Sequence, residues 1–124
     1  MAQNMPPNTT FTCYFIQSPT KPFGACQYCM DLKTDAYGYG TTFFHGITTQ
    51  AYAMNAENAG ESQNEDGPAS GTQLEHFGMW FSSLQDAQTV LNNPSLTGTP
   101  FDGGTPPAHA GPQAMNDGSP DPKF

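Results

Sequence analysis

Arginine is absent from this sequence of 124 residues, and lysine occurs only at Lys21, Lys33 and Lys123. Eleven Asp and Glu residues oppose these three cations, which leaves a net charge of −8. A protein that binds nucleic acid needs a cationic surface to displace counterions from the phosphates. The sequence therefore excludes nucleic acid as a partner, and it also excludes recognition of phosphate or carboxylate by a guanidinium group.

Long apolar segments are also lacking. No apolar run approaches the roughly 20 residues that a membrane-spanning helix needs. The N-terminal residues MAQNMPPNTT contain neither the charged part nor the apolar part of a secretory signal. We therefore expect no membrane insertion, and either synthesis in the cytoplasm or residence within an assembled particle; the localisation is otherwise unknown.

Aliphatic residues are scarce, so nine Phe, five Tyr and the single Trp80 must supply most of the core. Aromatic side chains bury large areas, and a compact core is therefore possible. The length allows one domain. We expect an N-terminal arm over 1–8, one small β-rich domain over 9–96 with an acidic loop over 55–72, and an extended tail rich in Pro and Gly over 97–124.

The clearest strand is predicted over 9–17, where Phe11, Cys13 and Phe15 alternate with Thr12, Tyr14 and Ile16. A long strand or a bent hairpin is predicted over 41–54, and a further strand over 73–81. The segment 26–34 fits a short strand or one helical turn equally well. The predicted fold class is therefore α+β: a small, mostly antiparallel β-sheet with one short helix and long irregular termini.

The helix is predicted over 83–92, where Leu84, Ala87, Val90 and Leu91 form an apolar face. Ser82, followed three residues later by Gln85, matches a capping box, which is typical of a helix start. The sequence Asn92-Asn93-Pro94 ends the helix.

The strongest chemical motif is the pair Cys26 and Cys29, which are separated by two residues. Cysteines at this spacing can share a metal ion. Together with Cys13 and His45 they form a possible zinc site, because tetrahedral zinc accepts three thiolates and one imidazole. The alternatives are one small disulfide or buried thiols packed as small apolar groups. No other cofactor is expected.

A redox function for Cys26 and Cys29 is a further alternative. Thioredoxin-like proteins place such a pair at a helix N-terminus, where the helix dipole lowers the thiolate pKa. The residues after Cys29, MDLKTDAYGYG, allow at most two helical turns before the glycines. Because the count is odd, at least one of the three cysteines stays without a partner in the chain or bonds to another chain.

Aromatic residues outside these motifs suggest contacts with other proteins. Trp80 is expected in the core, with an exposed anchor for a partner as the alternative. Phe101 and Phe124 are the aromatic residues of the tail, and aromatic anchors often carry interface energy. The leading hypothesis is a non-enzymatic structural or accessory subunit of a larger assembly, such as a virion or capsid accessory protein or a small subunit of a large complex. Its partners would be protein subunits of that assembly, held through its extended termini.

Overall fold

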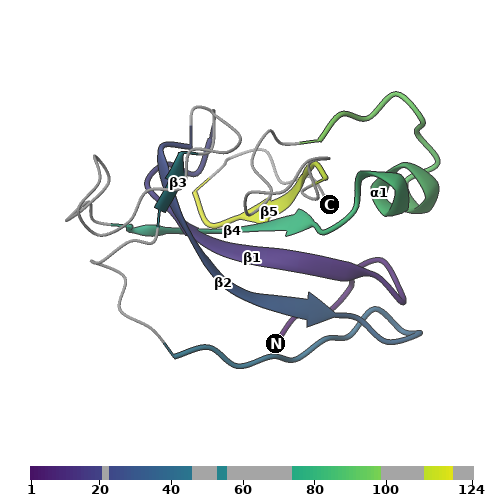
Figure 1. The fold of residues 1–124 in the computed structure, drawn as a ribbon. Coiled ribbons are helices and arrows are strands. Elements are labelled where there is room, and N and C mark those ends of the chain that lie inside the picture. The colour runs from purple at the N-terminus through teal and green to yellow at the C-terminus, as the bar shows by residue number, and fades with distance from the viewer. Residues whose placement is uncertain (21–22, 46–52, 56–73, 99–110, 119–124) are drawn as a thin grey trace.

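The protein folds around one five-stranded antiparallel sheet, shown in the computed structural model in Figure 1. The structure describes residues 1–20, 23–45, 53–55, 74–98 and 111–118. The elements are β1 (Thr10–Ile16), β2 (Ala25–Lys33), β3 (Ala53–Asn55), β4 (His76–Phe81), α1 (Leu84–Val90) and β5 (Gln113–Asn116). The strand order is β3-β2-β1-β4-β5. The predicted α+β fold, with a small antiparallel sheet and a short helix, is confirmed.

The central strand β1 pairs with β2 on one side and with β4 on the other. The segment that fitted either a strand or a helical turn is a strand, β2, which extends over nine residues. Opposite β2, the register shifts after Cys13: Cys13 pairs with Met30, whereas Tyr14 pairs with Tyr28. Cys29 is therefore the additional residue of a β-bulge, which places it beside Met30 on one face of the sheet.

Alternation along β1 divides the core between the two faces of the sheet, as predicted. One face carries the arm-side cluster, whose buried members are Met5, Phe11, Cys13, Cys29, Leu32, Met79, Phe81, Ala87 and Ala114. The other face carries the Trp80 cluster, whose members are Tyr14, Ile16, Phe23, Cys26 and Trp80. Successive residues of a strand point to opposite faces, which explains why neighbours in β1 belong to different clusters.

Aromatic rings order the Trp80 cluster. Tyr14 and Phe23 meet Trp80 edge-on, with ring centroids at 5.5 Å and 5.1 Å respectively. Edge-to-face contacts of this kind are favoured by the quadrupole of each ring. The Trp80 ring lies over Gly78 of the same strand, where any Cβ would collide with it. Gly78 is therefore required in β4 for packing.

The helix begins one residue later than the predicted capping box. Ser83 is the N-cap, and its hydroxyl accepts a hydrogen bond from Asp86 N at 3.1 Å. Ser82 instead contacts Thr12 on β1 through their hydroxyl groups, with the two oxygens 2.6 Å apart. The helix packs Ala87 into the arm-side cluster. No helix in the described ranges is long and apolar enough to cross a membrane.

The N-terminal arm is irregular, as expected, but it lies against its own domain. Ala2 and Gly40 form an antiparallel bridge, with N···O distances of 2.8 and 3.0 Å. Met5 N donates to Gly38 O at 3.2 Å, and the Met5 side chain is buried in the arm-side cluster. This contact requires the glycine, since Gly38 has a φ of +78° and a Cβ there would collide with the Met5 carbonyl.

The long strand predicted over 41–54 is wrong for residues 41–45. These residues pair with none of the described strands, and the nearest bridge is the one between Ala2 and Gly40. Of the rest, residues 46–52 lie outside the described part of the chain, and residues 53–55 form β3, which pairs with the start of β2. The predicted acidic loop likewise lies outside the described residues, except for Asn55 at the end of β3.

The predicted tail also needs correction. Residues Gln113–Asn116 form β5, which pairs antiparallel with β4, and Ala114 is buried in the arm-side cluster. Phe81 N donates to Pro112 O at 3.1 Å, and Gly111 N donates to Phe81 O at 2.7 Å. Part of the region assigned to a tail is therefore an edge strand of the sheet.

Thr34 fastens the arm to the end of β2, and its removal gives a first prediction. Its buried hydroxyl accepts from Thr9 N at 3.0 Å and donates to Pro6 O at 2.6 Å. Thr34→Val would leave both groups without this partner, so we expect the free energy of unfolding to fall by about 1–3 kcal/mol. Urea denaturation measures this loss, and Thr41→Val, at an exposed position, is the control. Equal stabilities of the two variants would contradict the role of Thr34.

Candidate functional site

The two most exposed aromatic side chains of the described chain, Tyr37 and Phe43, lie in the segment that follows β2. Tyr37 and Phe43 are 84% and 85% exposed, and Tyr39 is 50% exposed. From position 39 to 45 the chain alternates: Tyr39, Thr41, Phe43 and His45 face solvent, whereas the even-numbered residues are buried or half-buried. Such alternation is typical of an extended chain with one covered face. We call residues 39–45 the exposed strand.

Phe44 anchors the exposed strand to the sheet from its covered side. Its ring packs against Phe15 of β1, with centroids 5.6 Å apart, and joins the arm-side cluster. On the solvent side the rings of Phe43 and His45 lie 6.0 Å apart. Figure 1 shows this segment running below β2 and past the N-terminus. One face of the exposed strand is therefore held by the core, and the other face presents aromatic rings to solvent.

Asp35 fixes the turn that leads into the exposed strand. Its Oδ1 accepts hydrogen bonds from Tyr37 N at 2.8 Å and from Tyr39 N at 3.0 Å. The backbone closes the same turn, since Asp35 N donates to Tyr39 O at 2.7 Å. A carboxylate that bonds the following backbone amides is a common way of stabilising a turn. The position of Tyr39 is thus set by local hydrogen bonds.

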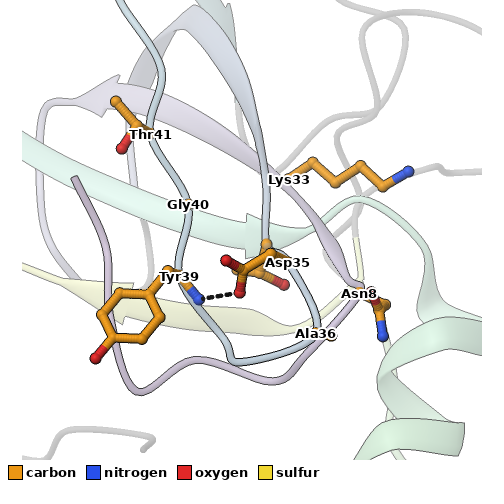
Figure 2. A pocket seen from close by; sticks show the side chains of 8 residues that line it. Asn8, Lys33, Asp35, Ala36, Tyr39, Gly40 and Thr41 are labelled. Atoms are coloured by element: carbon orange, nitrogen blue, oxygen red, sulfur yellow. Dashed lines mark hydrogen bonds between the residues drawn. The ribbon is translucent and has the colours of Figure 1, made fainter.

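An open hollow of about 540 Å³ adjoins this turn. Its lining comprises Asn8, Lys33, Thr34, Asp35, Ala36, Tyr39, Gly40 and Thr41. Figure 2 shows the bond from Tyr39 N to Asp35 and the Lys33 side chain extending away from that carboxylate. The charged side chains of Lys33 and Asp35 in the hollow therefore point in different directions. Tyr39, Gly40 and Thr41 belong both to the lining of the hollow and to the exposed strand.

Within the part of the chain that the structure describes, the backbone of the exposed strand has few hydrogen-bond partners. Gly40 bonds Ala2 through both its N–H and its C=O, and Tyr39 O accepts from Asp35 N. For Thr41 to His45, no backbone hydrogen bond to any part of the described chain is found. An extended segment whose N–H and C=O groups make no bond to the described residues is a template for a further strand.

The four residues predicted as zinc ligands are not gathered at one point. Cys13 and Cys29 lie in the arm-side cluster, whereas Cys26 lies in the Trp80 cluster on the opposite face of the sheet. His45 is exposed on the exposed strand. Among the described residues, no three His, Cys, Asp or Glu side chains lie close enough together to hold a metal ion. The residues present therefore do not fit a Cys3His zinc site in this fold.

The same geometry separates the redox pair. Cys26 and Cys29 lie within β2 rather than at a helix N-terminus, and they point to opposite faces. All three cysteines are in the thiol form. Burial raises the pKa of Cys13 to about 12, and the neighbouring Cys29 and Asp31 add to the rise. Burial likewise raises the pKa of Cys29 to about 11, against a backbone hydrogen bond at Phe15 that lowers it. These two thiols are therefore poor nucleophiles near neutral pH.

The raised thiol pKa values predict a loss of stability at alkaline pH. Well below pH 9.0, the ordinary thiol pKa, Cys13 and Cys29 remain protonated whether the chain is folded or not. As the pH rises from there towards about 11 to 12, the unfolded chain loses both protons while the folded chain retains them, so unfolding becomes more favourable.

Urea denaturation between pH 8 and pH 10.5 measures this slope. The double variant Cys13→Ala, Cys29→Ala keeps every tyrosine and is expected to lose stability less steeply over that range. Comparing slopes rather than absolute stabilities removes the cost of the smaller side chains. Parallel slopes in the two proteins would mean that the thiols ionise as readily in the folded chain as in the unfolded one.

A histidine and a carboxylate meet where β4 and β5 lie side by side. His76 Nδ1 is 3.1 Å from Asp117 Oδ1, and Phe77 N donates to Asp117 Oδ2 at 2.8 Å. Asp117 N also donates to Phe77 O at 3.1 Å. No Ser, Thr or Cys among the described residues hydrogen-bonds to the His76 ring. The pair therefore links β4 to the residue that follows β5.

The residues predicted to bind partners have different locations. Trp80 is fully buried, which agrees with its interpretation as a core residue and leaves no side-chain surface for a partner. Phe101 and Phe124 lie outside the described residues. The exposed strand was missed because its residues were assigned to a paired strand. The signal available in the sequence is the run Tyr37–Gln50, which contains no Asp, Glu, Lys, Arg or Pro.

Comparison with protein-family models, with curated proteins and with solved structures gives no match to this chain.

Proposed function

We propose that this protein is a non-enzymatic structural subunit of a larger protein assembly, and that the exposed strand is its contact with a neighbour. The observation that carries the proposal is the 85% exposure of Phe43 on a segment whose opposite face is fixed to the core by Phe44. Burying a Phe side chain fully is worth about 1.5–3 kcal/mol. An exposed ring on a fixed support is thus a favourable anchor for another protein.

The electrostatics of the chain support the same proposal. Eleven acidic residues dominate its charge, yet the run Tyr37–Gln50 is free of charged side chains apart from the titratable His45. The centres of protein interfaces are depleted in charged residues and enriched in Tyr, Phe and Trp. The exposed strand, with Tyr39 and Phe43 facing solvent, has this composition.

The proposal moves the contact from the termini to the middle of the chain. Extended termini were expected to hold the neighbours, but the arm packs Met5 into its own domain and β5 belongs to its own sheet. An element already bonded within the chain must first detach before it can strap a neighbour. The exposed strand can make its contacts without any such rearrangement.

Photo-crosslinking tests the proposal in the cells that produce the protein. A benzophenone amino acid replaces Phe43 in one variant and Tyr37 in another, because the two side chains are almost equally exposed. Tyr37 belongs to the turn and not to the exposed strand, so it is the matched control. We expect a covalent adduct from position 43 at several times the yield from position 37. Equal yields, or no adduct at position 43, would refute the proposed contact.

A further inference from the structure

Two of the three cysteines face each other across β1 and β2 at the β-bulge. Tyr14 pairs with Tyr28, and one step further on each strand lie Cys13 and Cys29; the bulge sets Met30 opposite Cys13 as well. Cys13 and Cys29 also lie on one face of the sheet, because both are buried members of the arm-side cluster. Facing residues of two antiparallel strands have Cα atoms about 4.5–5.5 Å apart, a separation that a disulfide can span.

We propose that Cys13 and Cys29 form an oxidation site, at which a disulfide joins β1 to β2 while Cys26 remains a thiol. Three cysteines can pair in three ways, and the sheet selects one of them. Cys26 belongs to the Trp80 cluster on the opposite face, so the sheet separates it from both other thiols. This site is independent of the proposed function, because it lies within the sheet and not on the exposed strand.

The surroundings of the two thiols suit a disulfide. Cys13 is 1% exposed and Cys29 is 8% exposed, and the residue opposite Cys13 on β4 is the apolar Met79. A disulfide carries neither a charge nor a hydrogen-bond donor, so an apolar cluster accepts it. The thiol of Cys29 makes only a long contact of 3.6 Å to Gln27 O, and a thiol is a weak donor. Little is therefore lost when its proton is removed.

The oxidant in this proposal is a small disulfide, and the bond forms by two exchange steps. One cysteine loses its proton to solvent, and its thiolate attacks the small disulfide, which forms a mixed disulfide and releases one small thiolate. The thiolate of the second cysteine then attacks the protein sulfur of the mixed disulfide and releases the second small thiolate. The protein thus loses two protons and two electrons, and the small disulfide is reduced to two thiols.

The folded sheet protects the same pair from rapid oxidation. Burial raises the pKa of Cys29 from 9.0 to about 11, so near neutral pH the thiolate fraction is about a hundredfold smaller than in the unfolded chain. The low exposure of both thiols also hinders the approach of an oxidant. We therefore expect the bond to form during folding or when β1 and β2 separate, and to form slowly in the chain that is already folded.

The test is disulfide mapping of the full chain in a mixture of oxidised and reduced glutathione near pH 8. One sample stays in urea, a second is refolded from urea, and a third is kept folded throughout. Free thiols are then alkylated and the chain is cut with chymotrypsin, since Tyr14 lies between Cys13 and Cys26 and Tyr28 lies between Cys26 and Cys29. Each cysteine therefore ends in a separate peptide.

We expect the pairing to change when the chain folds. In urea the nearest cysteines, Cys26 and Cys29, should pair most, because closing a short loop costs less entropy. After refolding, the bond should join Cys13 to Cys29 and leave Cys26 alkylated. The sample kept folded should form this bond tenfold more slowly or worse. The refolded, oxidised chain should also have a higher urea midpoint than the reduced chain, because the bond constrains the unfolded state.

Two variants provide matched controls, and circular dichroism verifies that both are folded. Cys26→Ala should refold with the bond between Cys13 and Cys29, whereas Cys29→Ala should refold with no internal disulfide. A bond to Cys26 after refolding of the parent, or an internal bond in Cys29→Ala, would show that the sheet does not select the pair. Free thiols at both Cys13 and Cys29, glutathione left on either of them, or a lower urea midpoint after oxidation would also overturn the proposal.

Discussion

A chain that ends after residue 110 is expected to be far less stable than one that ends after Gly118. The two chains differ only in residues 111–118, which contain β5. Without them, Phe81 N and Phe81 O lose their bonds to Pro112 and Gly111, and Phe77 O loses its bond from Asp117 N. At about 1 kcal/mol for each hydrogen bond, these three alone give a loss of about 3 kcal/mol, before the β4–β5 ladder itself is considered.

A point substitution tests the same contact without changing chain length. Ala114 is 1% exposed in the arm-side cluster, whereas its neighbour Met115 is 40% exposed on the same strand. Ala114→Asp would bury a charge that has no partner, whereas Met115→Asp places the same charge in solvent. Urea denaturation followed by circular dichroism compares the four proteins. If both truncated chains unfold together, and Ala114→Asp behaves like Met115→Asp, β5 is not an integral part of the sheet.

The difficulty of predicting β5 from the sequence has a physical cause. Gln113–Asn116 reads QAMN, which contains no β-branched or aromatic residue and lies among glycines and prolines. Its strand conformation comes from pairing with the edge of β4 and from the burial of Ala114 in the arm-side cluster. Strand propensity depends strongly on such neighbours, and a single sequence does not reveal them. The strand β1, whose alternation matches both faces of the sheet, was predictable.

The position of the cysteines was only partly predictable. Once 26–34 is known to be a strand, the odd separation of Cys26 and Cys29 already places them on opposite faces. Because the sequence of 26–34 fits a strand and a helical turn equally well, it does not by itself place the two cysteines on opposite faces. The bulge that brings Cys29 beside Met30 depends on pairing with β1, so it is visible only in the sheet. The redox hypothesis required a helix N-terminus at Cys26 and Cys29, and the zinc hypothesis required both of these side chains on the same side as Cys13 and His45; the strand β2 provides neither.

The exposed strand shows that a high strand propensity predicts an extended backbone but does not predict that the segment pairs with another strand. Its Thr and Phe residues favour an extended backbone, and residues 41–45 alternate between exposed and half-buried as such a backbone does. Propensity does not supply a neighbour, however, and here the bridge to Ala2 stops at Gly40. The sequence thus predicts the extended conformation of this segment, but not that it stays unpaired with the described strands. The proposed function depends instead on the exposure of Phe43 along this segment, which the sequence does not predict.

Trp80→Ala is expected to destabilise the protein by about 3–5 kcal/mol, the range found when a large buried aromatic is truncated. Trp80 is 0% exposed, and both Tyr14 and Phe23 would lose an edge-to-face contact. Small domains have a total stability of about 5–15 kcal/mol, so the loss is a large share of it. Phe43→Ala removes an exposed ring, and we expect its stability to stay within about 0.5 kcal/mol of the parent.

The two variants thus separate the core from the contact surface. Trp80→Ala should shift urea denaturation, followed by circular dichroism, to lower concentration. Phe43→Ala should reduce association at unchanged stability. Because the alanine variant of Trp80 risks complete unfolding, Trp80→Phe provides an intermediate case that keeps an aromatic ring. Fluorescence of the parent gives an independent check, since its only tryptophan should resist quenching by acrylamide until the chain unfolds. Ready quenching of the folded protein, together with near-native stability of Trp80→Ala, would place Trp80 on the surface and make it the better candidate for the contact.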